Sequence, residues 1–374
     1  MDLEFTEEEA ALRDSVRDVV EGISPPSVVR AIFEEQGDAS EVWRQMVELD
    51  WPGLAIAEEH GGVGMGFLEL AIVAEQLGRA VVPGPFLATA TQFAPAVREL
   101  GDADAQARIL PKVAAGQLTG ALAVAERGSW RLDDLGVAAQ ATPSGDGWKL
   151  SGRKEAVLDG ATADQILVVV RGDAGLGAFV VDRSQVVVEP RHIADPTMPI
   201  ADLVLDGIEV GGDAVLAAPG ADREARVQRV VEEATVILAI NGIAACREAF
   251  DMTLAYAKER EQYGRLIGSF QALKHRFANL YLSVERASSV CWFAALTIAE
   301  DDQRRSQATS IAKAAVGECQ SLLATDAIQL HGGIGFTWEH DVHFLVKRAK
   351  VADALFGNAY AHRARLAELL GVAA

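Results

Sequence analysis

Five residues in the last third of the chain are of types that can bind a nucleotide. Arg260 offers planar, permanently charged donors that suit a pyrophosphate. Gln271 and Gln329 can both donate and accept hydrogen bonds at a base or a ribose. Gly332 and Gly333 allow close approach of the backbone, and the amides of a glycine-rich turn can face an anion. Each of these residues also has a purely structural interpretation. Arg260 could lie on a solvated helix face, and Gly332 and Gly333 could simply end a helix.

Three histidines near these residues raise the question of a metal site. His340 and His343 are three residues apart and could share one helix face, with His331 nearby. A single pair without a dependable third ligand is a weak metal signal, so hydrogen-bonded histidines are the better interpretation. The sequence contains neither a Ser/His/Asp motif nor a phosphate-cradling P-loop, and we expect no metal ion.

The first part of the chain, residues 1–116, predicts a helical domain. Acidic and apolar residues recur at three- and four-residue spacings in segments 3–20, 40–49 and 68–77. A glycine-rich stretch, residues 57–66, lies between the last two segments. No clear strand precedes it and no βαβ unit follows, so it is interpreted as a structural loop and not as a dinucleotide fingerprint.

Residues 117–216 differ, because short β-branched runs alternate there with Gly, Asp, Ser and Pro. This spacing predicts a small β-sandwich or barrel. Around Ala217-Ala-Pro219-Gly220 the chain is expected to turn helical again. The predicted strands are residues 122–124, 148–150, 166–170, 178–181, 186–188 and 203–205.

Residues 217–374 are predicted to form a helical bundle, which completes an α+β fold of three domains. Their apolar residues recur every three to four positions over several turns, so the helices must pack against one another. Part of this surface is expected to remain for other subunits. The clearest stripe consists of Leu273, Phe277, Leu280, Val284, Ala287 and Cys291.

Composition excludes several classes of protein. The net charge of −20, from 54 acidic and 34 basic residues, argues against binding to nucleic acid or to an anionic membrane surface. No apolar run approaches the ~18 to 20 residues that cross a bilayer. The start of the sequence lacks the features of a secretory signal, and Cys246, Cys291 and Cys319 suit buried free thiols. Together these features indicate a cytoplasmic protein.

Two motifs carry a resemblance to a known family. Gln329-Leu-His-Gly-Gly-Ile-Gly-Phe336 resembles the carboxyl-terminal flavin-site signature of the acyl-CoA dehydrogenases, and Arg260-Glu-Gln-Tyr263-Gly264 resembles a second family motif upstream of it. The glycine-rich loop and the α, β, α order also match. The resemblance covers essentially the whole chain, and it implies a C-terminal four-helix bundle and FAD as cofactor.

The same resemblance assigns roles to single residues. It places Arg260, Tyr263, Gln271, Gln329, Gly332 and Gly333 at the ADP end of FAD, which family members reach across a dimer interface. The family oxidises acyl-CoA thioesters between the α and β carbons, with a carboxylate as base and the flavin as hydride acceptor. An electron acceptor such as an electron-transfer flavoprotein is then expected.

At the flavin-ring end the chain departs from the family pattern. Phe356 stands before Gly357, where family members with their base on the last helix carry a glutamate, and it cannot accept a proton. Ala125, Ala156 and Leu158 stand where family members carry a threonine, a tryptophan and a second threonine against the flavin ring. Concerted loss of these contacts and of the base suggests that the local catalytic pocket is not used.

A base on an earlier helix is the remaining possibility. Some family members place the glutamate on the helix before the Arg260 motif, where counting back from Arg260 arrives at Ala234. The neighbouring Glu232 and Glu233 are expected to be a solvated pair, because one residue rotates a helical side chain by about 100°. Glu233 is kept as the fallback candidate.

These observations are best explained if the chain is a subunit that lacks a complete active site of its own. It resembles the subunit without the catalytic glutamate in actinobacterial heteromeric acyl-CoA dehydrogenases, which form tetramers of two related chains and act on CoA thioesters of steroid side chains. A homologous partner in a heterotetramer would then hold most of the FAD. The alternatives are a self-sufficient homo-oligomeric enzyme that uses Glu233, and a non-catalytic scaffold that binds CoA thioesters without flavin.

Overall fold

The computed structural model describes residues 5–131 and 136–372. The chain divides into two compact units, each assembled from segments that are far apart in the sequence. The helical unit comprises residues 1–37, 71–83 and 235–374, and the sheet unit comprises residues 38–70 and 84–234. The domain boundaries predicted after residues 116 and 216 stay a prediction.

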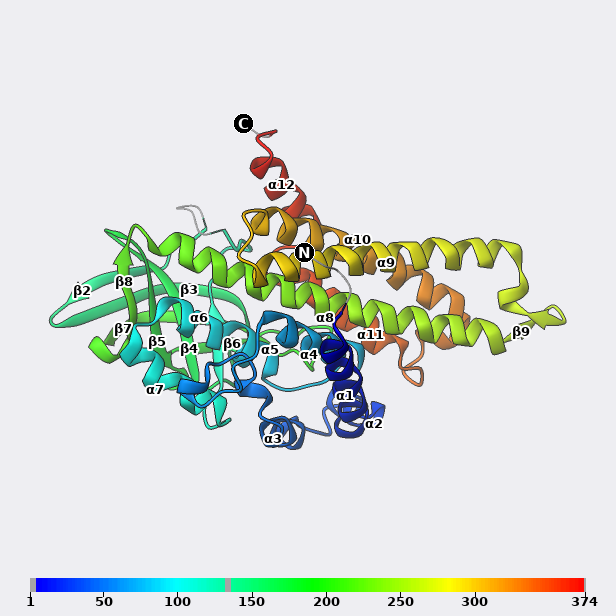
Figure 1. Cartoon of the computed structure of the whole chain (residues 1–374), viewed down its shortest axis with the longest axis horizontal. Helices are drawn as coiled ribbons and strands as arrows, with labels where there is room; N and C mark the ends of the chain where they lie inside the picture. Colours follow the sequence, from blue (N-terminus) through cyan, green and yellow to red (C-terminus); the bar gives the residue numbers. More distant parts are fainter. Residues whose placement is uncertain (1–4, 132–135, 373–374) are drawn as a thin grey trace. The chain divides into compact units, whose positions relative to one another are not determined.

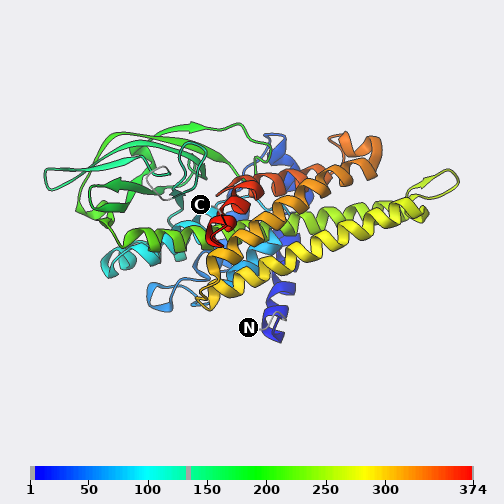
Figure 2. The same cartoon turned by 90° about the horizontal axis from the view of Figure 1, so that it is seen from above.

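The helical unit is a bundle of long helices, shown side by side in Figures 1 and 2. An ion pair of 2.5 Å between Arg247 and Glu285 joins the first two long helices, and the predicted apolar stripe from Phe277 to Cys291 is buried. The amphipathic pattern therefore predicted this packing correctly. The helices are α1 (Glu7–Ile23), α2 (Pro26–Phe33), the end of α4 (Phe67–Arg79), most of α8 (Arg223–Glu259), α9 (Gln271–Ala299), α10 (Arg305–His331), α11 (Val342–Ala354) and α12 (Ala359–Leu369).

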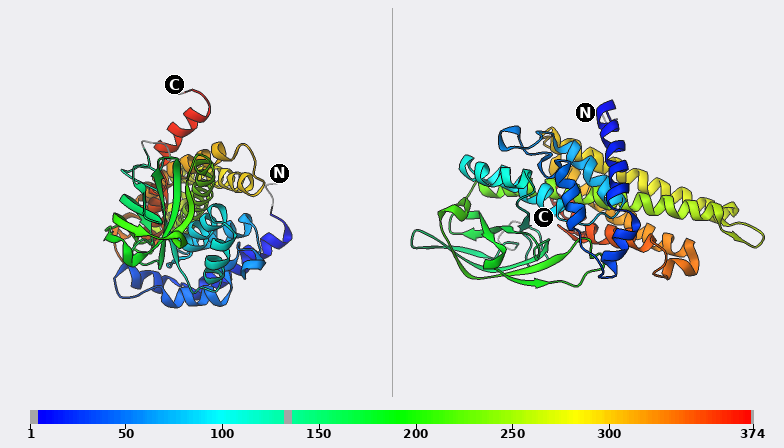
Figure 3. Two further views of the ribbon diagram at one scale, coloured as in Figure 1. Left: turned by 90° about the vertical axis from the view of Figure 1, so that its left-hand side faces the viewer. Right: turned by 90° about the horizontal axis from the view of Figure 1, so that it is seen from below.

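The sheet unit contains one eight-stranded sheet with the order β6-β7-β3-β2-β4-β5-β8, in which β1 pairs with β4. Only one pair, Gln140 with Arg171, joins β2 to β4. The two halves of the sheet enclose a common core, in which the rings of Trp148 and Phe179 lie 5.8 Å apart. Figure 3 (left) shows these strands in green. The strands are β1 (Gly120–Ala123), β2 (Gln140–Ser144), β3 (Gly147–Leu158), β4 (Gln165–Gly172), β5 (Gly175–Asp182), β6 (Val187–Pro190), β7 (Ile200–Val210) and β8 (Val215–Gly220).

The sheet unit also contains shorter helical elements, most of which precede the strands. In the glycine-rich loop, a Cβ on Gly62 would lie 2.1 Å from the carbonyl oxygen of Ile56, so only glycine fits there. This contact confirms the interpretation as a structural loop. The elements are α3 (Ser40–Glu48), η1 (Trp51–Gly53), η2 (Glu58–His60), the start of α4, α5 (Phe86–Ala88), the π-helix η3 (Thr89–Phe93), α6 (Ala94–Leu100), α7 (Ala103–Ala114), η4 (Arg183–Gln185), η5 (Gly212–Ala214) and the first turns of α8.

Two strands differ from the sequence-based expectation. β2 was not predicted, because Gln140–Ser144 is polar and lacks a β-branched run. β8 occupies Val215–Gly220, where a return to helix was expected, and α8 begins only at Arg223. Pairing with β5 overrides the local preference of this segment.

Two further predictions concern membranes and cysteines. In the described part of the chain, no helix combines the length and the apolarity needed to cross a bilayer. Cys246, Cys291 and Cys319 are buried free thiols, as predicted.

Candidate functional site

The Arg260 motif forms a two-residue β-hairpin at the end of α8. Arg260 directly follows the helix, and its amide donates to the carbonyl of Tyr256 at 2.9 Å. Strands β9 (Glu261–Gln262) and β10 (Arg265–Leu266) then pair across Tyr263 and Gly264, whose φ angles are +56° and +74°. Two positive φ angles define a type I′ turn, which matches the twist of a hairpin. The turn holds Tyr263 92% exposed.

The Gln329 motif lies at the end of α10 and runs into the 3-10 helix η7 (Gly332–Phe336). The amide of Gly332 donates to the carbonyl of Gln329, and Gly332 has φ +66° and ψ −141°, which only glycine adopts without strain. A Cβ added to Gly332 or Gly333 would meet no atom within 4 Å. The backbone of this glycine pair is therefore open to a ligand or to another chain.

Side-chain contacts bring the two motifs to the same end of the bundle. Tyr256, one turn before Arg260, stacks on His331 with ring centroids 4.7 Å apart. Arg276 of α9 forms a 2.5 Å ion pair with Asp326 of α10. Because these two helices are antiparallel neighbours, Gln271 and Gln329 both lie beyond this ion pair in the same direction.

All six residues proposed for the ADP end are exposed: Arg260, Tyr263, Gln271, Gln329, Gly332 and Gly333. Gln271 contacts the Nε2 atom of His275 at 3.1 Å. Among residues 5–131 and 136–372, no hydrogen bond or ion pair holds the Arg260 guanidinium. The six residues are thus accessible, and the Arg260 guanidinium is available to an anion.

In the sheet unit, a second tight turn holds the segment in which Ala125 lies. Glu126 and Ser129 exchange backbone hydrogen bonds of 2.9 and 2.7 Å across Arg127 and Gly128, which both have positive φ. Lys154, fully buried, donates to Glu126 at 2.5 Å and to the carbonyl of Val124 at 3.2 Å. Burial lowers the pKa of Lys154, although the negative charge of Glu126 acts in the opposite direction.

A β-bulge places Ala156, the second altered position. Glu155 and Ala156 of β3 together face Asp202 of β7, because the register shifts between Lys154 and Val157. Ala156 adopts φ +52°, and its amide donates to Asp202 at 3.0 Å. The bulge takes the Ala156 amide out of the hydrogen-bond ladder between the strands. The carboxylate of Asp202 accepts a hydrogen bond from this amide instead, and so stabilises the strained conformation.

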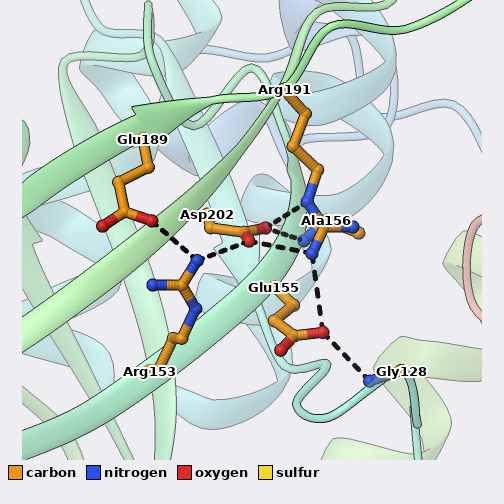
Figure 4. A network of polar contacts seen from close by, with 7 residues as sticks. All are labelled: Gly128, Arg153, Glu155, Ala156, Glu189, Arg191 and Asp202. Carbon is orange, nitrogen blue, oxygen red and sulfur yellow. Dashed lines mark hydrogen bonds and ion pairs between the residues drawn. The ribbon is translucent and has the colours of Figure 1, made fainter.

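Asp202 is the centre of the ion-pair network in Figure 4. Arg153 donates to Asp202 and to Glu189, both at 2.7 Å, and Arg191 donates to Asp202 at 2.8 Å. Burial alone would raise the pKa of Asp202, but the hydrogen bonds from Arg191, the Ala156 amide and Arg153 outweigh it and lower the pKa.

The network extends from the bulge to the turn that follows Ala125. Arg191 also lies 3.5 Å from Glu155, which accepts from the amide of Gly128 at 3.0 Å. In the backbone, the amide of Glu155 donates to the carbonyl of Ala125 at 2.8 Å. The two altered positions are thus parts of one stiff polar assembly.

Phe356 lies in the corner between α11 and α12, in the helical unit. Its φ is +52°, and its carbonyl accepts from Nε2 of His362 at 2.9 Å. The buried Lys313 donates to the carbonyl of Ala352, in the last turn of α11. Burial lowers the pKa of Lys313 to about 8. Two buried side chains, those of His362 and Lys313, therefore fix the backbone of this corner. The side chain of Phe356 itself cannot act as a base.

The expectation of a solvated glutamate pair was wrong. Glu232 is 2% and Glu233 is 5% exposed. One guanidinium nitrogen of Arg98 lies 2.8 and 2.7 Å from the two carboxylate oxygens of Glu233. Arg98 is 135 positions away in the sequence, and the count along the helix gave no sign of it. Both oxygens of the fallback base are therefore occupied by a cation.

The three histidines form contacts with other groups. The rings of His331 and His340 lie 4.3 Å apart, and Nδ1 of His331 lies 2.8 Å from the carbonyl of Ala327. His340 precedes α11, so it does not share a helix face with His343. The described residues contain no group of three or more His, Cys, Asp or Glu side chains that could hold a metal ion.

Comparison with known proteins identifies the family. Models described as acyl-CoA dehydrogenase N-terminal domain and acyl-CoA dehydrogenase C-terminal domain match residues 6–117 and 225–371. The chain is 33% identical over 345 residues to the acyl-CoA dehydrogenase IpdE2 of Mycobacterium tuberculosis, a match that covers 92% of this chain and 91% of that protein. The chain belongs to the acyl-CoA dehydrogenase family.

Solved structures of acyl-CoA dehydrogenases share the fold. The ChsE4–ChsE5 complex from Mycobacterium tuberculosis matches with a TM-score of 0.90 and 26% identity over 99% of both chains. A variant of the Tcur3481–Tcur3483 steroid ACAD matches with a TM-score of 0.86 and 29% identity over 98% of both chains. Acyl-CoA dehydrogenases are FAD-dependent oxidoreductases that act on acyl-CoA thioesters, and this chain is of that type.

The residues of this acyl-CoA dehydrogenase fit one end of FAD better than the other. Arg260, whose guanidinium has no partner among the described residues, and the open glycine pair suit a pyrophosphate. Ala125 and Ala156 are half-buried and Leu158 is 3% exposed, and none of the three side chains offers a hydroxyl or an aromatic face. At these three positions the chain therefore lacks the side chains that the family resemblance implies for the flavin-ring end.

Proposed function

We propose that this chain is the subunit without a catalytic base in a heteromeric acyl-CoA dehydrogenase. With a homologous partner, in a heterotetramer, it takes part in the FAD-dependent α,β-dehydrogenation of an acyl-CoA thioester. The observation that carries the proposal is the contrast between the two halves of the site. The ADP-end residues are assembled and exposed, whereas Phe356 stands at the position of the base in a corner with a fixed backbone.

In this proposal, Arg260, Tyr263, Gln271, Gln329, Gly332 and Gly333 bind the ADP end of an FAD that is held mainly by the partner. When bound, FAD supplies the acceptor for the hydride in such oxidations. The role of this chain is to bind the pyrophosphate through Arg260 and to present the open amides near Gly332. The base and the flavin-ring contacts come from the partner.

Exposed apolar side chains near the half-site support a partner subunit. Ile334, Phe336 and Trp338, which follow the glycine pair, are 42%, 79% and 59% exposed, and Leu266 of β10 is 40% exposed. Exposed apolar side chains of this kind are typical of a protein interface. The similarity to the ChsE4–ChsE5 complex and to the Tcur3481–Tcur3483 steroid ACAD supports a second, related chain.

The substrate is proposed to be the CoA thioester of a steroid side chain. This follows from the name of the steroid ACAD that the chain resembles at 29% identity. An electron-transfer flavoprotein is the proposed electron acceptor. Three buried free thiols are consistent with work in the reducing cytoplasm.

The self-sufficient alternative, with Glu233 as base, is disfavoured by Arg98. A carboxylate whose two oxygens contact a guanidinium must lose that interaction before it can take a proton from a substrate. The scaffold alternative, without flavin, is disfavoured by the presence of the ADP-end residues. A protein that no longer binds flavin would be expected to lose both halves of the site.

Expression of the chain alone separates the three functions. We expect a protein with little bound FAD that reduces no acceptor dye with any acyl-CoA, together with activity once the partner is present. The measurements are flavin absorbance, native mass and dye reduction. A flavin-saturated homo-oligomer that turns over acyl-CoA would favour Glu233 or another carboxylate of this chain, and a flavin-free complex would favour the scaffold.

A further inference from the structure

A cavity of about 230 Å³ lies within the helical unit, among α1, α2, the end of α4, α8 and the start of α11. Most of its lining is apolar, with Val29, Val81, Met252, Phe344 and Leu345 among the lining residues. None of the six residues proposed for the cofactor lines it. The cavity is therefore distinct from the half-site described above.

Four buried polar atoms in this lining lack a hydrogen-bond partner among the described residues: Nε of Arg17, Oγ of Ser24, Oε1 of Gln76 and Oε2 of Glu248, the last of which is ion-paired with Arg79. Only Ser24 and Gln76 are uncharged. Ser24 and Gln76 are each 2% exposed, and both line the cavity. In the part of the chain that the structure describes, neither Oγ of Ser24 nor Oε1 of Gln76 has a hydrogen-bond partner. A buried polar group without a partner is costly, so these atoms indicate a ligand or bound water.

Prolines, a residue with positive φ and a buried arginine shape the walls of the cavity. Ser24 ends α1, and Pro25 and Pro26 fix the turn into α2. Val81 has φ +52°, which is a strained conformation for a β-branched residue, at the position after a helix where glycine is usual. The buried Arg348 holds this turn by donating to the carbonyl of Val82 at 3.0 Å. These features constrain the backbone around the cavity.

The charges around the cavity nearly cancel. Arg79 pairs with Glu248 at 2.6 Å, and Asp341 pairs with Arg30, which lies outside the lining. The lining also contains Arg17, which pairs with Asp14 at 3.5 Å, and Glu21. Burial raises the pKa of Glu248, although Arg79 acts in the opposite direction. A charged ligand would therefore gain no net counter-charge and would lose its hydration.

We propose that this cavity binds a small neutral molecule with an apolar body and one hydroxyl or amide group. The polar group donates to Oε1 of Gln76 and accepts from the hydroxyl of Ser24, while the apolar body contacts Met252 and Phe344. The cavity is smaller than the ~300 to 1,000 Å³ of sites for drug-sized ligands, so the ligand is of the size of a single substituted ring. The site is independent of the function proposed above.

The methyl group of Met252 provides a direct readout. The full chain is labelled with ¹³C at its methionine methyl groups, the Met252 signal is assigned through Met252→Leu, and benzyl alcohol, benzamide, toluene, benzylammonium and benzoate are titrated. We expect a saturable shift of the Met252 signal with benzyl alcohol and benzamide. Toluene should bind several-fold more weakly, and the two ions should not bind.

Two sets of variants test the polar contacts. In Ser24→Ala combined with Gln76→Met, the affinity for benzyl alcohol should fall about tenfold, while toluene should bind no more weakly than before. Thr309→Val is the matched control, because Thr309 is also a buried hydroxyl without a partner in the described residues but does not line the cavity. It should leave the affinity unchanged.

Three results would overturn the proposal. One is the absence of any saturable Met252 shift in the unaltered chain, which would mean that the cavity holds only water. Another is equal affinity of the unaltered chain for benzyl alcohol and for toluene. That result would mean that Ser24 and Gln76 do not contribute to binding. The third is binding of benzylammonium or benzoate at least as tight as that of the alcohol.

Discussion

At the scale of single residues, backbone strain marks the candidate site. Nine described residues other than glycine have positive φ, and four of them lie in the segments discussed for the cofactor and the base: Arg127, Ala156, Tyr263 and Phe356. Such conformations cost free energy and persist where the surroundings impose them. Two of these four residues, Ala156 and Phe356, stand where the side chain differs from the pattern that the family resemblance implies.

The first residue-scale prediction concerns repair of the base. Phe356→Glu alone should yield no dehydrogenase activity in the isolated chain, because the flavin-ring end still lacks the side chains replaced by Ala125, Ala156 and Leu158. A half-buried carboxylate without a partner should also reduce stability. Dye reduction and thermal unfolding check both outcomes.

A graded series sharpens this test. Phe356→Glu is combined with Ala125→Thr, Ala156→Trp and Leu158→Thr, one added at a time. Activity should require several of the changes together. Substantial turnover from the single substitution in the absence of a partner would show that the flavin site is intact and that the half-site proposal is wrong.

A second residue-scale prediction concerns acid stability. Burial and the nearby charge of Lys313 lower the pKa of His362 to about 3, from an ordinary value of 6.5. Between these two values the unfolded chain binds a proton that the folded chain does not. The stabilising effect is therefore complete above pH 6.5 and is lost as the pH falls towards 3, by up to ~1.4 kcal/mol per pH unit.

Urea unfolding at pH 7.5, 6 and 5 measures this slope. His362→Gln keeps a donor for the carbonyl of Phe356 but does not titrate, so its unfolding free energy should depend less steeply on pH. An equal slope in the variant and in the unaltered chain would mean that His362 does not cause the acid sensitivity.

Sequence reasoning reached some of these residues and missed others for a physical reason. Arg260 and Gly332 were recognisable because their motifs are local. Arg98 was not, because it meets Glu233 only through the fold. Asp202 was equally invisible, since nothing in an isolated strand shows that an aspartate faces a bulge on its neighbour.

At the scale of elements, the bulge in β3 shows how the fold places a side chain. Two residues of β3 face Asp202 of β7, and the extra residue, Ala156, takes a left-handed conformation. The strand itself was predicted from its apolar residues, but only as residues 148–150. Its full extent, Gly147–Leu158, follows from pairing with β7 and from the ion pairs of Arg153, which a local pattern does not contain.

The bulge leads to a prediction at this scale. Ala156→Gly removes the Cβ that disfavours positive φ, so it should raise the free energy of unfolding by about 1 kcal/mol. Ala125→Gly is the matched control, since this half-buried alanine lies outside the left-handed region and should lose about 0.5 to 1 kcal/mol. Chemical denaturation compares the two, and a loss of stability in Ala156→Gly equal to that in the control would contradict the strain argument.

The hairpin β9–β10 is the opposite case, because the residues that form its turn could be recognised from the sequence alone. Its turn contains Gly264 at a position of positive φ, and Tyr263 precedes it in the same conformation. The motif that includes both residues was the basis for placing them at the cofactor. The exposure of Tyr263 was not foreseen, and it agrees with a role outside this chain.

At the scale of the whole molecule, the α, β, α order and the α+β class followed from periodicity and from the family resemblance. The eight-stranded sheet required pairing between distant segments, such as β3 with β7 and β5 with β8. Long-range pairing of this kind is the part of a fold that local patterns describe least well. The proposed dependence of the site on a partner is harder still to derive from the sequence, because it concerns groups that this chain does not contain.

The central claim is that the ADP-end residues of this chain bind a flavin held mainly by a partner. It is tested most directly by the flavin content of the complex that is purified from its native cells through a tag on this chain, with and without Arg260→Ala. Loss of a charge-assisted contact with a pyrophosphate is worth about 1.5 to 3 kcal/mol, or one to two decades of affinity. We predict an intact complex of two related chains with reduced FAD occupancy in the variant. Unchanged FAD occupancy in an intact complex, or a flavin-saturated assembly of this chain alone, would contradict the account.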